Sequence, residues 1–222
     1  SRLLADGISV SKPLVEINGE PLLHRLISLF LRNKAESIAL IINEEMNDVK
    51  AYVEQLNLPV PFEWIVKSTP DSLHSFYELL PLLKDTEKLC LTTVDPIFYE
   101  EEFVAYINAF QKDDFFDALM AVTDFIDDES PLYVKTDEQL NILGYANDYY
   151  PEARYISGGI YCFTHKVLKL LPEVINQGVT RMRGFQQAII DAGLPAKAYP
   201  FSKIIDVDHA SDRDKAESFL KQ

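Results

Sequence analysis

The chain has 222 residues, of which 47% are hydrophobic and 25% are charged, and this predicts one domain over residues 1–222 with a sizeable core. The formal net charge of −14 argues against a nucleic-acid partner, but a few local cations or a metal ion can still hold a phosphate substrate. No apolar run is long enough to cross a membrane and no signal-like segment opens the sequence, so no membrane partner is expected.

The first 122 residues alternate between helical and strand patterns. Apolar residues at helical spacing fall into four segments, and short β-branched runs lie between them. The predicted helices cover residues 21–33, 48–56, 72–83 and 100–111. The predicted strands cover residues 37–42, 62–66, 88–94 and 117–122. This alternation predicts an α/β fold, a three-layer αβα arrangement with a mainly parallel sheet.

The second half departs from this alternation. Residues 132–134 and 140–145 flank a turn and predict an inserted hairpin, which makes the sheet mixed. A strand is predicted over residues 155–163, where it is interrupted by two glycines, and another over residues 204–207. Helices are predicted over residues 166–174, 181–192 and 211–220.

Two cysteines, Cys90 and Cys162, lie far apart in the sequence and each sits inside an apolar run. Such residues are usually buried, reduced thiols. Reduced thiols indicate a reducing, cytoplasmic location.

Three aspartates are candidate metal ligands, because ligands of an open α/β sheet bind beyond the carboxyl ends of its strands. Asp95 ends one predicted strand, and Asp206 and Asp208 end another. A carboxylate at such a place can bind Mg²⁺, which itself holds phosphate oxygens. The alternative is that each caps the loop or helix that follows. Capping by Asp208 or Ser211 is favoured, while both roles stay open for Asp95 and Asp206.

Four cations are candidate anion-binding residues. Pro13 holds Lys12 extended, so that its ammonium can reach a phosphate, and Arg2 can offer a bidentate fork to the same group. Arg181 and Arg183 precede a predicted helix and can clamp an anionic substrate. A solvated surface position is the alternative for each of them.

Two further segments have a binding and a structural interpretation. Residues 68–75 join a strand to a helix, so their hydroxyls and the helix N-terminus can hold a base or a phosphate, or can simply cap the helix. Gly158 and Gly159 indicate either a close approach of a ligand to the backbone or a β-bulge.

The order of these segments resembles the sugar-1-phosphate nucleotidyltransferases, also called NDP-sugar pyrophosphorylases. Residues 1–23 resemble the tail of that family's phosphate-binding loop and the helix that follows it, through Ser-Arg-Leu, Lys-Pro-Leu and Gly-Glu-Pro-Leu. Residues 72–73 resemble the base-proximal segment, and residues 91–95 the strand that ends in a metal-binding aspartate. Residues 156–163 resemble the sugar-site strand, and residues 205–212 the closing segment.

This resemblance implies a Rossmann-like, GT-A-like nucleotidyltransferase fold of the short type that carries only the catalytic domain. It also implies Mg²⁺-dependent transfer of a nucleotide from an NTP to a sugar 1-phosphate, with release of pyrophosphate. The residues that the resemblance assigns are the catalytic Arg2 and Lys12, the nucleotide-binding Ser1, Ser72 and Leu73, the substrate-binding Gly159, Arg181 and Arg183, and the Mg²⁺ ligands Asp95 and Asp206.

The sequence also departs from the family pattern. The family's first strand and glycine loop have no counterpart from Ser1 onward, and Asp208 stands where the closing motif has glycine. Two alternatives follow from these departures. One is a module that binds a nucleotide or sugar phosphate without turnover. The other is a cytidylyltransferase for a phosphocholine-like substrate, which the 11% aromatic content would suit.

Overall fold

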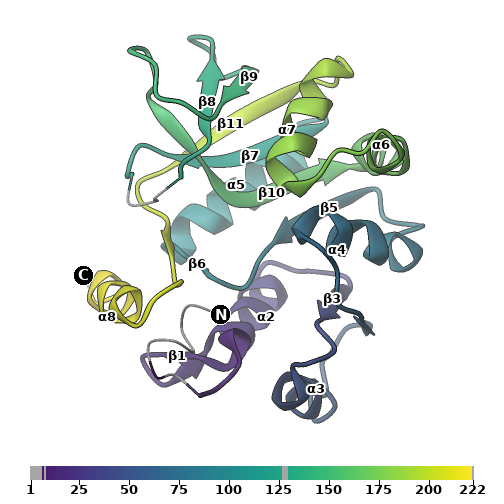
Figure 1. Ribbon diagram of the computed structural model, residues 1–222, viewed down its shortest axis with the longest axis vertical. Helices are drawn as coiled ribbons and strands as arrows, with labels where there is room; N and C mark the ends of the chain where they lie inside the picture. Colours follow the sequence, from purple (N-terminus) through teal and green to yellow (C-terminus); the bar gives the residue numbers. More distant parts are fainter. Residues whose placement is uncertain (1–6, 8, 127–129, 222) are drawn as a thin grey trace.

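Figure 1 shows the computed structural model, which describes residues 7, 9–126 and 130–221. Ser1 and Arg2, two of the residues assigned from the sequence, lie outside these ranges.

A six-stranded sheet forms the centre of the fold. Its strands are β5 (Lys88–Thr92), β7 (Ala118–Thr123), β8 (Tyr133–Thr136), β9 (Ile142–Ala146), β10 (Tyr155–Thr164) and β11 (Ala196–Phe201). The strand order is β11-β7-β10-β8-β9, and β5 also pairs with β10. Strand β10 is antiparallel to its three neighbours β5, β7 and β8. Strand β11 is parallel to β7, and β9 is antiparallel to β8. Four strands, β5, β7, β8 and β11, therefore run in one direction, and β9 and β10 run in the other. The expected mixed sheet is therefore present, although β10 separates β5 from β7 and makes most adjacent pairs antiparallel.

Three two-stranded sheets complete the strands of the described residues. β3 (Ile38–Ile42) and β4 (Phe62–Val66) are parallel, as the alternation of the sequence predicted. β1 (Glu16–Ile17) pairs with β2 (Glu20–Pro21), and β6 (Pro96–Ile97) pairs with β12 (Ile205–Asp206), both in antiparallel fashion. The β6–β12 pair matters for function, because it brings the segment that precedes α8 beside the segment that follows β5.

Helices cover both faces of the central sheet, which confirms the predicted three layers (Figure 1). One face packs against α4 (Ser72–Leu79), α6 (His165–Asn176) and α7 (Arg181–Asp191). The other packs against α5 (Glu100–Lys112) and α2 (Leu22–Arg32). Outside these layers, α3 (Asn47–Val53) packs on the β3–β4 pair and α8 (Ala210–Phe219) packs near β12.

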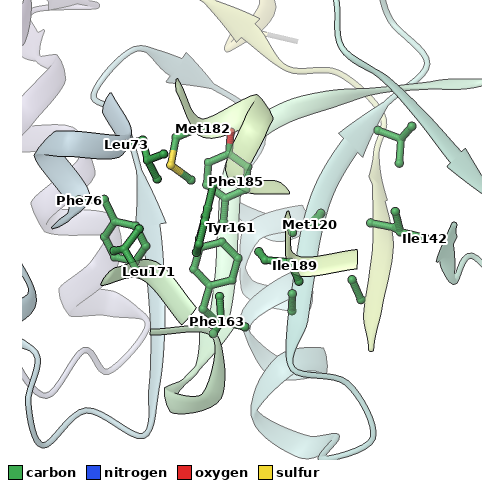
Figure 2. Packing of buried hydrophobic residues seen from close by; sticks show 14 of the residues in the cluster. Leu73, Phe76, Met120, Ile142, Tyr161, Phe163, Leu171, Met182, Phe185 and Ile189 are labelled. Atoms are coloured by element: carbon green, nitrogen blue, oxygen red, sulfur yellow. The ribbon is translucent and has the colours of Figure 1, made fainter. Parts of the chain in front are cut away.

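Strand β7 shows why the layers form. All six of its residues are buried, and alternate side chains point to opposite faces. Met120 and its neighbours at alternate positions join the cluster under α4, α6 and α7, while Leu119 and Ala121 join the cluster under α5. Figure 2 shows the first of these clusters, in which Leu73 of α4 lies beside Met182 of α7.

Two elements differ from their sequence predictions. The helix predicted over residues 72–83 ends at Leu79 and continues as a short 3₁₀ helix, Leu80–Leu82, because Pro81 has no backbone N–H to continue the α-helical hydrogen bonds. Strand β11 was not predicted, since Lys197 and Pro200 interrupt its apolar pattern. It lies at the end of the strand order, where a sheet tolerates proline.

None of the helices in the described part of the chain combines the length and the apolar character needed to span a bilayer.

Candidate active site

Most of the residues assigned from the sequence gather at one edge of the central sheet. This edge contains the carboxyl ends of β5 and β7 and the N-terminal half of β10, which runs the opposite way. The N-termini of α4 and α7 lie at the same edge, tied together because Asp71 accepts hydrogen bonds from the backbone N–H groups of His74 and Arg181. This is where an open α/β sheet binds its ligands.

Asp95 and Asp206 come from neighbouring strands at this edge. Asp95 lies between β5 and β6, and the pairing of β6 with β12 places Asp206 opposite Pro96. The backbone N–H of Val207 donates to the carbonyl oxygen of Asp95 over 3.2 Å, which fixes the connection further. Among the described residues, Oδ1 of Asp95 is buried and has no hydrogen-bond partner. A buried carboxylate oxygen without a partner is costly, so this oxygen is available for a ligand.

Lys12 is held at the same place by two ion pairs. Its Nζ donates to Oδ2 of Asp95 over 2.5 Å and to Oδ1 of Asp208 over 2.6 Å. Burial alone would lower the pKa of Lys12, but the two carboxylates outweigh it and the pKa is raised. The solvated position considered for Lys12 is therefore wrong.

The backbone around Lys12 is anchored as well. Lys12–Leu14 form one turn of 3₁₀ helix that contains Pro13, so the extended conformation expected for Lys12 is wrong and Ser11 is the extended residue. Ser11 donates from its N–H and its Oγ to the carboxylate of Asp48, over 2.9 and 2.6 Å. These contacts fix the loop, so that the flexible side chain of Lys12 is its movable part.

Asp208 does not cap the last helix, which corrects the favoured interpretation from the sequence. Helix α8 begins at Ala210, so Ser211 lies inside it and is not the cap either. Its cap is His209, whose N–H donates to Oδ2 of Asp212 over 2.8 Å in a capping box. Asp208 is thereby left to face Lys12.

A second part of the edge is an open cavity of about 440 Å³ between β9 and α7. It is lined by Leu132, Tyr145, Ala146, Asn147, Thr180, Arg181, Arg183, Gly184 and Gln187. Arg183 donates to Oδ1 of Asn147 over 3.0 Å and to the carbonyl oxygen of Ser130 over 2.9 Å. Arg181 has a φ of 63°, a left-handed conformation that costs energy outside glycine and often marks functional sites.

Tyr145 contributes a second buried polar atom without a partner in the described structure. Burial, with a smaller contribution from Tyr161, raises the pKa of its hydroxyl far above the ordinary value. The hydroxyl therefore stays protonated and can donate a hydrogen bond to a ligand.

Tyr161 joins the aspartate cluster to the cavity, and sequence reasoning did not single it out. Burial raises the pKa of Tyr161 to about 12, the hydrogen bond with Ser157 acts in the opposite direction, and the charge of Asp206 adds to the rise. Arg183 and Asp95 also act on it electrostatically, so both halves of the site lie within range of this one hydroxyl. Ser157 in turn donates to Oε1 of the buried Gln186 over 2.9 Å. The only sequence signal for Tyr161 and Ser157 was their place in the strand that resembles the family's sugar-site strand.

The two glycines of β10 form a β-bulge, one of the two interpretations left open. The pairing of β10 with β7 shifts register between Ser157 and Tyr161. A Cβ at Gly158 would lie 2.3 Å from Cδ1 of Ile204 and 3.2 Å from the carbonyl oxygen of Ala121, so a larger residue would have to displace the Ile204 side chain. Gly159 has a φ of 73°, and a Cβ there would lie 4.0 Å from Pro96, which places Gly159 beside the aspartate cluster.

The loop before α4 caps its helix, as one interpretation proposed. Asp71 is the N-cap, and hydrogen bonds from His74 lower its pKa although burial acts in the opposite direction. Ser72 opens the helix at the site edge, whereas the side chain of Leu73 is fully buried in the core. Only the backbone of Leu73 can contact a nucleotide.

No group of three or more histidine, cysteine, aspartate or glutamate side chains suited to a metal ion occurs among the described residues. Asp95 and Asp206 are a pair, so a metal held by them would need further oxygen ligands. Mg²⁺ characteristically takes these from substrate phosphates and water.

Comparison with known proteins agrees with this geometry. Residues 1–172 match the family described as the MobA-like NTP transferase domain. No curated protein matches the sequence.

Solved structures with the same fold include an inositol-1-phosphate CTP transferase from T. maritima, with a TM-score of 0.80, 21% identity and coverage of 100% of this chain and 91% of that one. They also include a putative glucose-1-phosphate thymidylyltransferase from Bacillus anthracis in complex with a sucrose, with a TM-score of 0.82, 16% identity and coverage of 100% and 91%. A nucleoside-diphosphate-sugar pyrophosphorylase from Vibrio cholerae RC9 has a TM-score of 0.73, 13% identity and coverage of 98% and 95%. Since the family match spans most of the sequence and agrees with the fold and the site edge, the chain belongs to the MobA-like NTP transferase domain family of nucleotidyltransferases.

Proposed function

We propose that this enzyme joins an NTP to a sugar 1-phosphate or a related polyol phosphate and releases pyrophosphate, with Mg²⁺ as cofactor. One observation carries the proposal. Among the residues that the structure describes, a buried oxygen of Asp95 has no protein partner at the carboxyl end of β5, beside Asp206 and Lys12. The folds that match this chain include enzymes named for inositol 1-phosphate, glucose 1-phosphate and nucleoside-diphosphate sugars, which supports the same substrate class.

The residues present fit a magnesium ion. Asp95 and Asp206 would hold it, since Asp95 directly precedes β6, Asp206 belongs to the paired strand β12, and Oδ1 of Asp95 has no protein partner in the described part of the chain. When bound, Mg²⁺ neutralises charge on the phosphates and orients them. No covalent intermediate with the protein is needed, because an oxygen of the acceptor phosphate can attack the α-phosphate directly.

The chain's own cations would bind the triphosphate. Lys12 carries an ammonium on an anchored loop within reach of Asp95. Arg2, which lies outside the described residues, stays a prediction for the same role. Together they would stabilise charge that develops at the α-phosphorus and on the leaving pyrophosphate. Ser72 and the backbone of Leu73, at the N-terminus of α4, would face the nucleotide.

The cavity between β9 and α7 would bind the acceptor. Arg181 and Arg183 offer positive charge to its phosphate. Gly159, beside Pro96, would leave the backbone open to the substrate at the aspartate cluster. Asn147 and Tyr145 offer hydrogen bonds to hydroxyl groups. The hydroxyl of Tyr145 needs such a partner, because it is buried and without one in the described structure.

This lining favours a polyol or sugar over phosphocholine. A quaternary ammonium binds best inside a cage of aromatic faces. Here Tyr145 is the one aromatic side chain among the lining residues, and two guanidinium groups would repel a cationic headgroup. The phosphocholine alternative is therefore the weaker one.

The test is pyrophosphate release, measured with each of the four common NTPs against sugar 1-phosphates, inositol 1-phosphate and phosphocholine, with Mg²⁺ present. Turnover with a sugar or inositol phosphate supports the proposal, whereas turnover with phosphocholine alone would correct the acceptor. NTP binding without turnover in every combination would overturn it in favour of a module that binds without catalysis.

A further inference from the structure

The loop that carries Lys12 forms a turn that its own sequence disfavours. Leu14 donates from its N–H to the carbonyl oxygen of Ser11 over 2.8 Å, so Lys12 and Pro13 are the two central residues of the turn. Proline at the second central position disfavours the helical conformation of the residue before it. A contact from another part of the chain is therefore needed to hold the backbone of Lys12 in this turn.

Asp48 makes that contact from a helix that is itself fixed. Its carboxylate accepts from the N–H and the Oγ of Ser11 over 2.9 and 2.6 Å, across 37 residues of sequence. Its Oδ1 also accepts from the N–H of Val49 over 2.9 Å, which orients the carboxylate at the start of α3. Val49 and Val53 are buried in the cluster that joins α3 to β3 and α2, so the acceptor sits on a rigid element.

The charge of Asp48 is kept by the same contacts. Burial alone would raise the pKa of Asp48, but the hydrogen bonds from Ser11 and from the backbone of Val49 outweigh it, and the pKa is lowered. The carboxylate therefore stays ionised, and hydrogen bonds to an ionised acceptor are stronger than those between neutral groups.

The conformation that Asp48 selects at Ser11 is one that a proline has built in. Ser11 has a φ of −60° and a ψ of 144°. The ring of proline fixes φ at about −65°. A serine backbone is free to leave this conformation unless a partner holds it. The two hydrogen bonds from Ser11 to Asp48 therefore restrict this loop as a proline ring would.

The restricted residue directly precedes the cation of the site. If the backbone left the turn, it would carry Lys12 away from the place where its ammonium meets Asp95. A ligand then binds more weakly, in proportion to the fraction of molecules whose loop is in the competent conformation. Because a bound triphosphate would itself hold Lys12 in place, the loss should appear in the binding of the nucleotide rather than in the chemical step.

We propose that Asp48 is a positioning residue of the nucleotide site, which holds the backbone of Lys12 ready for the triphosphate through the two hydrogen bonds from Ser11. Asp48 sets the affinity for the NTP in this way without a contact of its own. The inference rests on the proposed function, since it needs Lys12 to bind the triphosphate. It gives a role in the reaction to α3, which packs outside the three layers of the fold.

The first experiment removes the anchor and measures steady-state kinetics of pyrophosphate release with Mg²⁺. Asp48→Ala should raise the KM for the NTP about ten-fold and keep kcat within about two-fold. The KM for the acceptor should stay the same, because its cavity lies between β9 and α7. Lys12→Met is the contrast, since it removes the ammonium itself and should lower kcat as well. Glu101→Ala, an exposed acidic residue in the first turn of α5, is the matched control and should change neither constant.

The second experiment replaces the anchor with a proline. Ser11→Pro removes both donors but fixes φ, so its addition to Asp48→Ala should return the KM for the NTP to within about three-fold of the unmodified chain. Ser11→Ala added to Asp48→Ala is the matched control, because it removes the hydroxyl without restricting φ, and it should give no rescue. A KM raised by the lost charge of Asp48, or by weaker packing of α3, would not respond to the proline.

Amide hydrogen exchange, measured by NMR, reads the anchor without turnover. Leu14 and Val15 donate from their N–H groups to the carbonyl oxygens of Ser11 and Lys12 over 2.8 and 3.1 Å, so their exchange rates report on the turn. Asp48→Ala should speed exchange at both amides about ten-fold, and Ser11→Pro should reverse this. The amides of β7 should keep their rates, which shows that the variant is folded.

An unchanged KM for the NTP in a folded Asp48→Ala variant would overturn the role of Asp48, and so would a raised KM that Ser11→Pro leaves in place. Turnover by the unmodified chain together with either result would keep the proposed function and reject this inference. If the unmodified chain gives no turnover, the proposed function fails, and the dissociation constants of the four common NTPs take the place of KM. Weaker NTP binding by Asp48→Ala that the proline reverses would then keep the role of Asp48, whereas equal or absent binding would reject it.

Discussion

The two ends of the central sheet each carry a cavity and an aspartate that is at least partly buried, but they differ in how their polar groups are satisfied. The cavity at the far end has a volume of about 590 Å³ and is lined by Asp117, Thr164 and Lys166 among others. The cavity at the site edge is smaller, with about 440 Å³. At the far end, Asp117 accepts from Oγ1 of Thr164 over 2.8 Å and from Nζ of Lys166 over 3.3 Å. At the site edge, Asp95 and Tyr145 each keep a buried atom without a partner in the described structure.

This difference makes unsatisfied polar groups a better guide to the functional end than volume, although Oε2 of Glu102 in α5 is a third buried atom without a partner in the described structure. Native proteins satisfy nearly all of their buried polar atoms, because an unpaired one costs free energy. A buried polar atom that is unpaired in the free protein is explained when a bound ligand supplies its hydrogen-bond partner. The far cavity needs no ligand, since its buried carboxylate is already paired.

The largest expected effect comes from exchanging one carboxylate at each end for an amide. Asp95→Asn should lower kcat by about a hundred-fold to a thousand-fold, because the free oxygen of Asp95 would stabilise the transferred charge through the metal. Asp117→Asn is the matched control, and it should keep kcat while losing about 1–2 kcal/mol of stability with its charged hydrogen bonds. Steady-state kinetics and thermal melts measure both. Equal losses of kcat would remove the distinction between the two ends.

A smaller effect is expected from the cations at each end. Arg183→Lys should raise the KM for the acceptor phosphate about ten-fold or more, because a lysine cannot keep the fork that bridges Asn147 and Ser130 while it binds a phosphate. Lys166→Met at the far end should leave KM and kcat unchanged. An unchanged KM in Arg183→Lys would show that the acceptor does not use this cavity.

Tyr145→Phe tests the unpaired hydroxyl itself. Removing it should leave the stability of the free enzyme unchanged or raise it by about 1 kcal/mol, because the hydroxyl has no protein partner in the described structure. The KM for the acceptor should rise about five-fold.

Tyr106→Phe is the contrasting control, since the buried hydroxyl of Tyr106 donates to the carbonyl oxygen of Leu119 over 2.6 Å. It should lose about 1 kcal/mol of stability and keep its activity. A loss of stability in Tyr145→Phe would contradict the assignment.

The order of elements was predictable because local periodicity determines it. Strand β7 and helix α5 lie almost where the apolar spacing placed them. Strand β11 was missed because Pro200 is compatible with a strand only at a sheet edge, and the sequence does not say which strand lies there. Capping before α4 was predictable for the same local reason, since Asp71 and His74 are three residues apart.

The polar contacts of the site were less predictable, because they join residues far apart in the chain. Lys12 and Arg183 were singled out as cations, but their partners come from other elements. Asp208 was interpreted as a cap because it directly precedes a helix, whereas His209 took that role and left Asp208 for Lys12. Tyr145 gave no sequence signal, because its importance comes from a hydroxyl that has no hydrogen-bond partner in the described structure.

The smallest expected effect concerns the interior between the two ends, where Cys90 and Cys162 lie opposite each other on β5 and β10. Both are free cysteines in the described structure, but only Cys162 is fully buried as the sequence predicted, and Cys90 is partly buried. The neighbouring Cys162 thiol and burial together raise the pKa of Cys90 well above its ordinary value.

Because the thiolate is the reactive form, a thiol reagent such as Ellman's should react with the native enzyme at least about a hundred-fold more slowly than with the enzyme in guanidinium. The raised pKa predicts that this protection persists to about pH 9, where an ordinary thiol is largely ionised.

The same pKa shift of Cys90 also makes the free energy of unfolding depend on pH. The unfolded chain loses the proton of Cys90 at a lower pH than the folded one, so stability should fall as pH rises above the pKa of a free thiol. Rapid stoichiometric labelling of the native enzyme would show that the interior beside Asp95 opens readily, and the contrast between a closed sheet and an unsatisfied site edge would then fail.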